Sequence, residues 1–156
     1  MIEGALLPAI DESSTGFWDA CAVGELRVQA CAACHRLRMP PRPMCPWCRS
    51  FDSEWRLMSG SGRVWSFVVA HPPLLPAFAE LAPYNVIVVE LDDDPGDDAP
   101  PIRLVGNLVV AADRPINEIA PSTIEIGEPV RVVFDRPVGD APDSVRFPRW
   151  VRVHDG

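Results

Sequence analysis

The sequence predicts a mainly β protein that consists of an N-terminal helix, a small four-cysteine ribbon and a five-stranded barrel of the OB-fold type. Two C-x-x-C pairs lie ten residues apart near the N-terminus, and five β-branched runs separated by turns follow the Gly-Ser-Gly at residues 60–62. We therefore expect an N-terminal segment with a helix at residues 1–25, the zinc ribbon at 26–58 and the OB-fold barrel at 59–156.

The Ser-Ser-Thr at residues 13–15 predicts the start of a short helix, and Gly24 its end. The segment around this helix is polar and acidic, so its apolar face has no obvious core to reach. We expect that face to lie against a partner or a second copy of the chain. It consists of Phe17, Trp18 and Cys21.

The two C-x-x-C pairs predict a metal site. Each pair forms a tight knuckle that directs two sulfurs at one point, and residues 35–44 are long enough to form a hairpin arm that brings the knuckles together. Four thiolates complete a tetrahedral shell and leave no open position, which is typical of structural zinc. Iron uses the same ligands in rubredoxin-like sites, and zinc is preferred for its greater frequency. The predicted ligands are Cys31, Cys34, Cys45 and Cys48.

Two disulfides or a redox dithiol are the alternatives to this zinc ribbon. The first ten residues lack the basic region of a signal peptide, which predicts a cytoplasmic protein and disfavours disulfides. A thioredoxin-like pair would lie between a strand and a helix, whereas both pairs here lie in a Pro- and Arg-rich stretch. His35 follows a ligand directly; we interpret it as a surface residue, the alternative being that it replaces a cysteine as ligand.

The five expected strands are residues 63–70, 84–91, 102–110, 129–134 and 144–153, with a crossover near 113–122. The Gly-Asn at 106–107 marks a bulge or bend of the kind that small barrels need in order to close. Residues 80–100 hold seven acids and no base, and we expect a solvated loop there.

Composition excludes several classes of function. All 14 basic residues are arginine, so lysine Schiff-base chemistry and a P-loop are excluded within this chain. The net charge of −8 disfavours binding to nucleic acid, and no apolar run is long enough to span a membrane. The three histidines, at positions 35, 71 and 154, lie in no catalytic motif, and no catalytic residue is predicted.

Several motifs together carry a resemblance to a known family. They are CAACHRLRMPPRPMCPWC, GSGRVWSFVVAHPP, APYNVIVVELDD, RLVGNLV, IEIGEPVRVVF and FPRWV. In this order they resemble the OB-fold proteins with an N-terminal rubredoxin-like zinc ribbon that accompany acyl-CoA enzymes, over residues 17–153. The resemblance implies a small partner subunit, in a hetero-oligomer with a thiolase-fold enzyme such as a thiolase, acyltransferase or aldolase, with a coenzyme A thioester as a ligand.

Two further sets of residues are candidates for binding. The ribbon arginines Arg36, Arg38 and Arg42 can hold the phosphates of coenzyme A; the alternative is that they are solvated surface charges. The Pro-rich segment at residues 71–83 either folds back over the barrel mouth or forms part of a hydrophobic docking surface. That surface would consist of Trp65, His71, Leu74, Leu75 and Phe78.

Three functional hypotheses follow. In the first, the protein is a non-catalytic zinc-containing subunit that stabilises a thiolase-like enzyme and helps to bind or position its acyl-CoA. In the second, it is a single-stranded nucleic-acid-binding protein that uses the ribbon and the barrel face, as many zinc-ribbon and OB-fold proteins do. The third, an independent enzyme, lacks a catalytic constellation.

Overall fold

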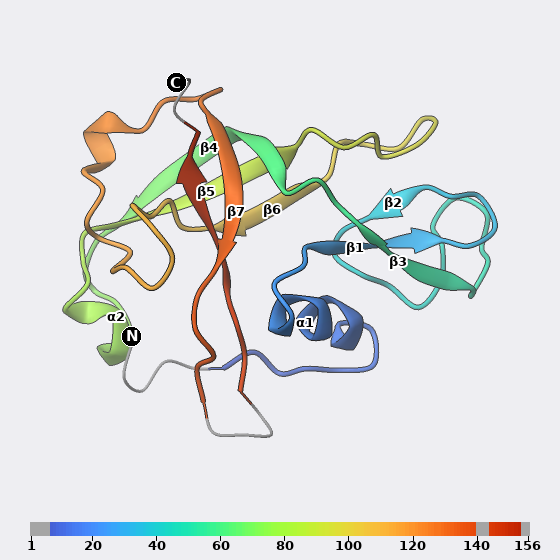
Figure 1. Cartoon of the computed structure of the whole chain (residues 1–156), viewed down its shortest axis with the longest axis horizontal. Coiled ribbons are helices and arrows are strands. Elements are labelled where there is room, and N and C mark those ends of the chain that lie inside the picture. The colour runs from blue at the N-terminus through green and yellow to red at the C-terminus, as the bar shows by residue number, and fades with distance from the viewer. Residues whose placement is uncertain (1–6, 140–143, 154–156) are drawn as a thin grey trace.

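The computed structural model describes residues 7–139 and 144–153, which form two antiparallel sheets and short helical elements (Figure 1). The ribbon is a three-stranded sheet in the order β2-β1-β3. Its strands are β1 (Arg27–Cys31), β2 (Leu37–Arg38) and β3 (Ser53–Leu57). Helix α1 (Thr15–Ala22) packs beside β1. No helix in the described part of the chain has the length and hydropathy needed to cross a bilayer.

The barrel half is a five-stranded sheet in the order β6-β5-β4-β7-β8. All five β-branched runs form strands, so the predicted mainly β fold with a zinc-ribbon region and an OB-like sheet is confirmed. Two short helical turns, α2 (Pro76–Ala79) and η1 (Pro121–Thr123), interrupt the connections. The strands are β4 (Ser61–Ala70), β5 (Tyr84–Leu91), β6 (Arg103–Gly106), β7 (Pro129–Phe134) and β8 (Pro148–Arg152).

The two edges of this sheet approach each other just after β6. The strand ends at Gly106, and Leu108 then forms a parallel bridge with Trp150 of β8. Gly106 is required by sterics, because a Cβ atom at this position would lie 2.9 Å from the Trp150 indole. The predicted bend at residues 106–107 is therefore the point where the chain leaves β5 and joins β8.

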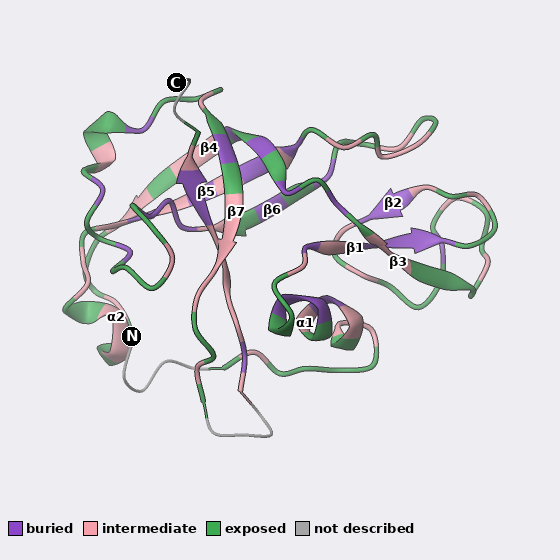
Figure 2. Cartoon of the chain, in the orientation of Figure 1, coloured by how far each residue is buried: buried purple, intermediate pink, exposed green. Residues whose placement is uncertain are grey.

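One apolar core runs through both halves of the molecule. Val28 of the ribbon and Val64, Ile87 and Trp150 of the barrel belong to a single buried cluster. Figure 2 shows the buried residues concentrated within the strands, while the loops are mostly exposed or half-buried. Because ribbon and barrel share this core, each contributes to the stability of the other.

The expectation that the apolar face of α1 lies against a partner is wrong for Phe17 and Cys21. Both belong to the chain's own core, and the Cys21 thiol is fully buried. Trp18 is half-buried and makes edge-to-face contacts with Phe17 and Phe147, at centroid distances of 5.1 and 5.8 Å. The core that the sequence pattern did not reveal is formed by the ribbon and by the long β7–β8 hairpin.

The acidic segment between β5 and β6 is also more ordered than a solvated loop. Asp93 accepts hydrogen bonds from the backbone N–H and the hydroxyl of Ser59. The backbone of the loop reaches the ribbon, where Leu37 N donates to Pro95 O at 2.8 Å and Arg36 Nε donates to Asp97 O at 2.5 Å. This acidic loop therefore ties the barrel to the basic ribbon, although Asp92, Asp94, Asp97 and Asp98 remain exposed.

Candidate functional site

Two matching knuckles position the four cysteines. In the first, Cys31 N donates to Arg36 O, and His35 N donates to Cys31 O. The second repeats this pattern at the same spacing, because Cys45 N donates to Ser50 O and Arg49 N donates to Cys45 O. His35 and Arg49 both have a left-handed φ, of 62° and 64°. Each C-x-x-C therefore closes in one tight turn that places its two thiols on the same side.

The knuckles bring the four sulfur atoms together. Cys31 Sγ lies 3.5 Å from Cys48 Sγ, Cys34 Sγ lies 3.6 Å from Cys45 Sγ, and all four atoms are within 4.8 Å of one another. The two sulfur atoms of a disulfide are only about 2.05 Å apart, so these cysteines are not paired as disulfides. Four sulfurs placed tetrahedrally around zinc at about 2.3 Å are separated by roughly 3.8 Å. The donor set and its spacing therefore fit a structural zinc ion, as in the predicted ligand set.

The surroundings of Cys31 favour its thiolate form. The backbone N–H of Cys34 lies 3.5 Å from Cys31 Sγ and, as the main cause, lowers the pKa of the Cys31 thiol to about 6. Cys31 and Cys45 are buried, whereas Cys48 is exposed. His35 is exposed and contributes no ligand atom to the cluster, in agreement with its interpretation as a surface residue. Its role is the left-handed turn of the first knuckle.

The three ribbon arginines proposed to bind coenzyme A differ in how far they are exposed. The expectation is wrong for Arg38, which is only 4% exposed and therefore cannot reach a ligand in solution. Arg38 Nε donates to Gln29 Oε1 at 2.6 Å, and its Nη1 is buried without a hydrogen-bond partner among the described residues. Arg36 is half-buried against Trp47 and the acidic loop. Of the three side chains, only that of Arg42 is exposed.

Apart from Trp65 in the middle of β4, the residues proposed for a docking surface lie in the connection between β4 and β5. His71 and Leu75 are exposed, while Leu74 is half-buried. Phe78 is half-buried and stacks at 6.1 Å on Tyr84, which packs against a second apolar cluster. The segment therefore partly folds back on the barrel, as the simpler interpretation expected. Trp65, in contrast, is 49% exposed on the face of the sheet.

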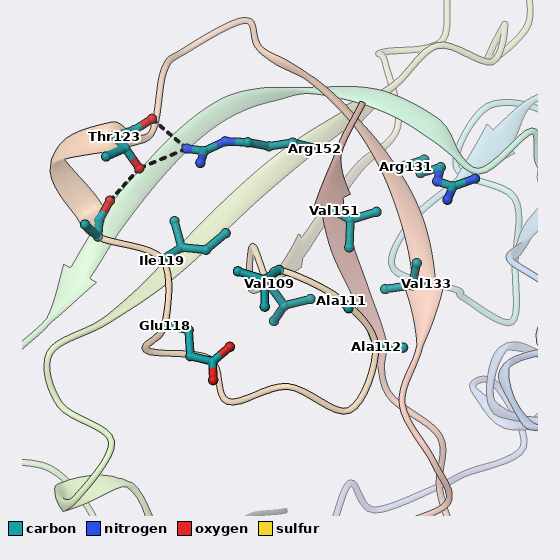
Figure 3. A pocket seen from close by; sticks show the side chains of 12 residues that line it. Val109, Ala111, Ala112, Glu118, Ile119, Thr123, Arg131, Val133, Val151 and Arg152 are labelled. Carbon is teal, nitrogen blue, oxygen red and sulfur yellow. Dashed lines mark hydrogen bonds between the residues drawn. The ribbon is translucent and has the colours of Figure 1, made fainter. Parts of the chain in front are cut away.

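An open groove of about 510 Å³ lies between the segment before β7 and the strands β7 and β8 (Figure 3). Val109, Ile119 and Val151 form much of its apolar wall. Arg152 crosses one end and donates to the carbonyl and hydroxyl oxygens of Thr123. Sequence reasoning did not identify this groove, because its walls come from positions far apart in the chain and match no motif.

The fold and the four-cysteine cluster together define a zinc-ribbon protein with an OB-fold domain. Residues 18–54 match the model of the ChsH2 rubredoxin-like zinc ribbon domain, and residues 55–135 match that of the ChsH2 C-terminal OB-fold domain. The chain belongs to this ChsH2 family, also described as DUF35 proteins. The resemblance inferred from the sequence motifs is thereby confirmed.

Relatives differ in length and in described role. A probable enoyl-CoA hydratase alpha subunit from Thermomonospora curvata is 43% identical over 79% of this chain, which covers 33% of that protein. The 3-oxo-4,17-pregnadiene-20-carboxyl-CoA hydratase alpha subunit of Mycobacterium tuberculosis is 30% identical over 95% of the chain and is covered to 39%. The chain thus spans between 33% and 39% of the length of these two relatives.

Other matches are similar in size to this chain. A DUF35 domain-containing scaffold protein from Methanothermobacter thermautotrophicus is 31% identical, with 74% of this chain and 75% of the relative covered. A solved structure titled as the Ltp2-ChsH2(DUF35) aldolase contains a chain that is 39% identical and superposes with a TM-score of 0.71. That match covers 94% of this chain and 98% of the other.

Proposed function

We propose that this chain is a non-catalytic, zinc-containing subunit of an acyl-CoA enzyme complex, and that its partner is a thiolase-like enzyme, such as a thiolase, acyltransferase or aldolase. One observation carries the proposal. Over nearly its whole length the chain matches a chain of similar size in a structure titled as an aldolase of Ltp2 and ChsH2. The names of the two hydratase alpha subunits also refer to enzymes that act on acyl-CoA thioesters, although not to a thiolase-like enzyme.

The side chains of the described residues support a non-catalytic role. No hydrogen bond in the described part of the chain joins the ring of His35 or His71 to a carboxylate or a nucleophile, and His154 lies outside the described residues. Four cysteines form the metal cluster, and burial raises the pKa of the fifth, Cys21, to about 12. A nucleophile needs an adjacent base and an oriented third group. The partner would therefore supply the reacting groups.

The zinc site supports a structural role for the metal. Four cysteines fill the tetrahedral shell, so no position is left for a substrate or an activated water. Zinc bound there would hold the ribbon strands together, and the ribbon in turn completes the core that it shares with the barrel. The metal would thus stabilise the whole subunit.

Help in binding acyl-CoA is the finer part of the proposal, and exposed Arg42 is its best candidate residue. A guanidinium group binds phosphate oxygens through two parallel hydrogen bonds. In the complex, Arg42→Gln should raise the KM for the acyl-CoA substrate and leave kcat unchanged. Arg56→Gln, at a half-buried ribbon arginine paired with Glu54, is the matched control. Equal KM values for all three proteins would indicate that Arg42 is only a solvated surface charge.

Purification of the tagged protein from its native host at low salt tests the subunit role. We expect a thiolase-like enzyme to be retained in stoichiometric amount, together with one zinc ion per chain, as measured by mass spectrometry and metal analysis. A zinc-loaded protein that is isolated alone, or with single-stranded nucleic acid, would contradict the proposal.

A further inference from the structure

The outward side of the sheet formed by β4, β5 and β6 carries an apolar surface that is interrupted by Ser66, the register partner of Val88. Its rows follow from the strand register: Val105 pairs with Val88 across β5 and β6, and Val86 pairs with Val68 across β5 and β4. Val68 is 62% exposed and Val105 is 70% exposed. We call this surface the outer face, and it consists of Trp65, Val68, Val86, Val88 and Val105.

The sequence of β5 is unusual for a strand with one side in water. Its inward residues, among them Ile87 and Val89, are fully buried, and alternation would place polar residues between them. Val86 and Val88 stand there instead. A continuous apolar run is typical of a strand that is covered on both faces. Within the described chain the inward residues of β5 are buried and Val86 and Val88 are half-buried, so the sequence of β5 fits a further cover from another molecule.

Trp65 adds an ordered anchor to this face. The register between β4 and β5 shifts between Val64 and Ser66, which marks a bulge at Trp65. The guanidinium carbon of Arg103 lies 3.9 Å from the centre of the indole ring, and Arg103 Nε donates to Glu90 at 2.8 Å. Arg103 therefore holds a half-exposed tryptophan in place before binding, and tryptophans and arginines of this kind often dominate interface energetics.

Size and charge identify the kind of partner. Three strands about 4.8 Å apart and about five residues long give an apolar patch of a few hundred Å², which corresponds to the centre of an interface of about 800 Å² on each partner. Exposed Leu75, in the connection between β4 and β5, can add to the rim. Glu90 and one aromatic ring make the face a poor platform for nucleic-acid bases.

Charge also argues against a second copy of the chain as the occupant. The acidic loop continues directly from β5 and carries four exposed aspartates at one end of the outer face. Self-association would bring together two chains that each have a net charge of −8. A protein partner with an apolar patch and a basic border beside this loop complements the surface in both shape and charge.

We propose that the outer face is the surface on which the enzyme subunit of the acyl-CoA complex docks; this inference rests on the proposed function. The partner presents an apolar patch to Trp65 and the four valines, and basic residues to the acidic loop. This surface differs from the one expected from the sequence, which centred on residues 71–83. The two have Trp65 in common, and Leu75 of the expected surface lies at the rim.

Substitutions on the outer face test the proposal in the complex retained by the tagged protein. Val68→Glu and Val105→Glu place a charge in the apolar patch and should each weaken binding of the enzyme subunit at least tenfold, as measured by surface plasmon resonance. The double variant V68T/V105T keeps the β-branched shape and should cause a smaller loss. Val23→Glu, at an equally exposed valine after α1, should bind within twofold of the unchanged protein. Zinc content and circular dichroism confirm that each variant folds.

The outcomes separate this proposal from the proposed function. If a thiolase-like enzyme is retained and the glutamate variants bind it as tightly as the unchanged protein, docking on the outer face is overturned and the subunit role stands. If no acyl-CoA enzyme is retained, the subunit role fails and this inference fails with it. If sedimentation shows that the chain alone is a dimer and that Val105→Glu is a monomer, the occupant is a second copy, which also overturns the proposal.

Discussion

The carboxamide of Asn85 binds both backbone groups of Leu108: Leu108 N donates to Oδ1 at 2.7 Å, and Nδ2 donates to Leu108 O at 2.9 Å. Nδ2 also donates to Ile116 O at 3.2 Å. Asn85 is fully buried at the start of β5, and Leu108 is the residue that bridges to β8. One side chain thus holds Leu108 beside β5 after the pairing between β5 and β6 has ended at Gly106.

Asn85→Ala should lower the free energy of unfolding by about 3 kcal/mol, because it leaves three buried backbone groups without partners. Asn85→Asp keeps the acceptor for Leu108 N but loses both donors, so it should destabilise the protein at least as much. Urea unfolding followed by tryptophan fluorescence measures both changes. An aspartate variant as stable as the unchanged protein would show that the two donated hydrogen bonds contribute nothing.

Cys34→Ser and Cys45→Ser should each abolish stoichiometric zinc binding and lower the thermal stability of the whole chain. The reason is that metal binding is coupled to folding of the ribbon, whose core continues into the barrel. Metal analysis and thermal unfolding check this prediction. Cys21→Ala is the control. Cys21 lies outside the cluster, so this variant protein should retain its zinc. Full metal content in either serine variant would contradict the four-thiolate site.

Local sequence patterns predicted the strands and the metal cluster well. The runs 84–91 and 129–134 form strands with the expected bounds, and the spacing of the cysteines brought all four sulfurs together. These features depend on the periodicity of a strand and on the geometry of a tight turn, which a short segment specifies by itself.

Features that depend on distant partners could not be predicted in this way. Phe17 packs into a core formed by residues far along the chain. The hydrogen bond between Leu37 and the acidic loop also joins distant parts of the sequence. In the sequence Arg38 cannot be told from a surface arginine, but in the structure it is buried and donates to Gln29 of β1. The outer face was missed for a different reason: β5 is apolar on both sides, and the sequence alone does not tell which side the chain itself covers.

Gln29 is expected to be the main support of the buried Arg38. Its Oε1 accepts from Arg38 Nε at 2.6 Å and from Arg42 N at 2.8 Å, so Gln29→Leu leaves the buried Arg38 Nε and the partly buried Arg42 N without this acceptor. We expect a loss of about 2 to 3 kcal/mol in the free energy of unfolding. The double variant Q29L/R38M removes the stranded charge and should recover part of this loss. Urea unfolding of Q29L, R38M and Q29L/R38M gives the coupling energy between Gln29 and Arg38. If the effects of the two single substitutions simply add in the double variant, the proposed support of Arg38 by Gln29 is contradicted.

Cys21 should make the protein less stable in alkali. Burial raises the pKa of its thiol from 9.0 to about 12, so the folded protein holds the proton more tightly than the unfolded chain. The stabilisation is complete below pH 9 and is lost as the pH rises from 9 towards 12, by up to about 1.4 kcal/mol per pH unit. Cys21→Ala removes this effect and leaves the zinc ligands unchanged. Urea unfolding measures the free energy of unfolding of both proteins at pH 8 and pH 10. Between these pH values the unchanged protein should lose more stability than the alanine variant. An equal loss in both proteins would mean that burial does not perturb the Cys21 thiol.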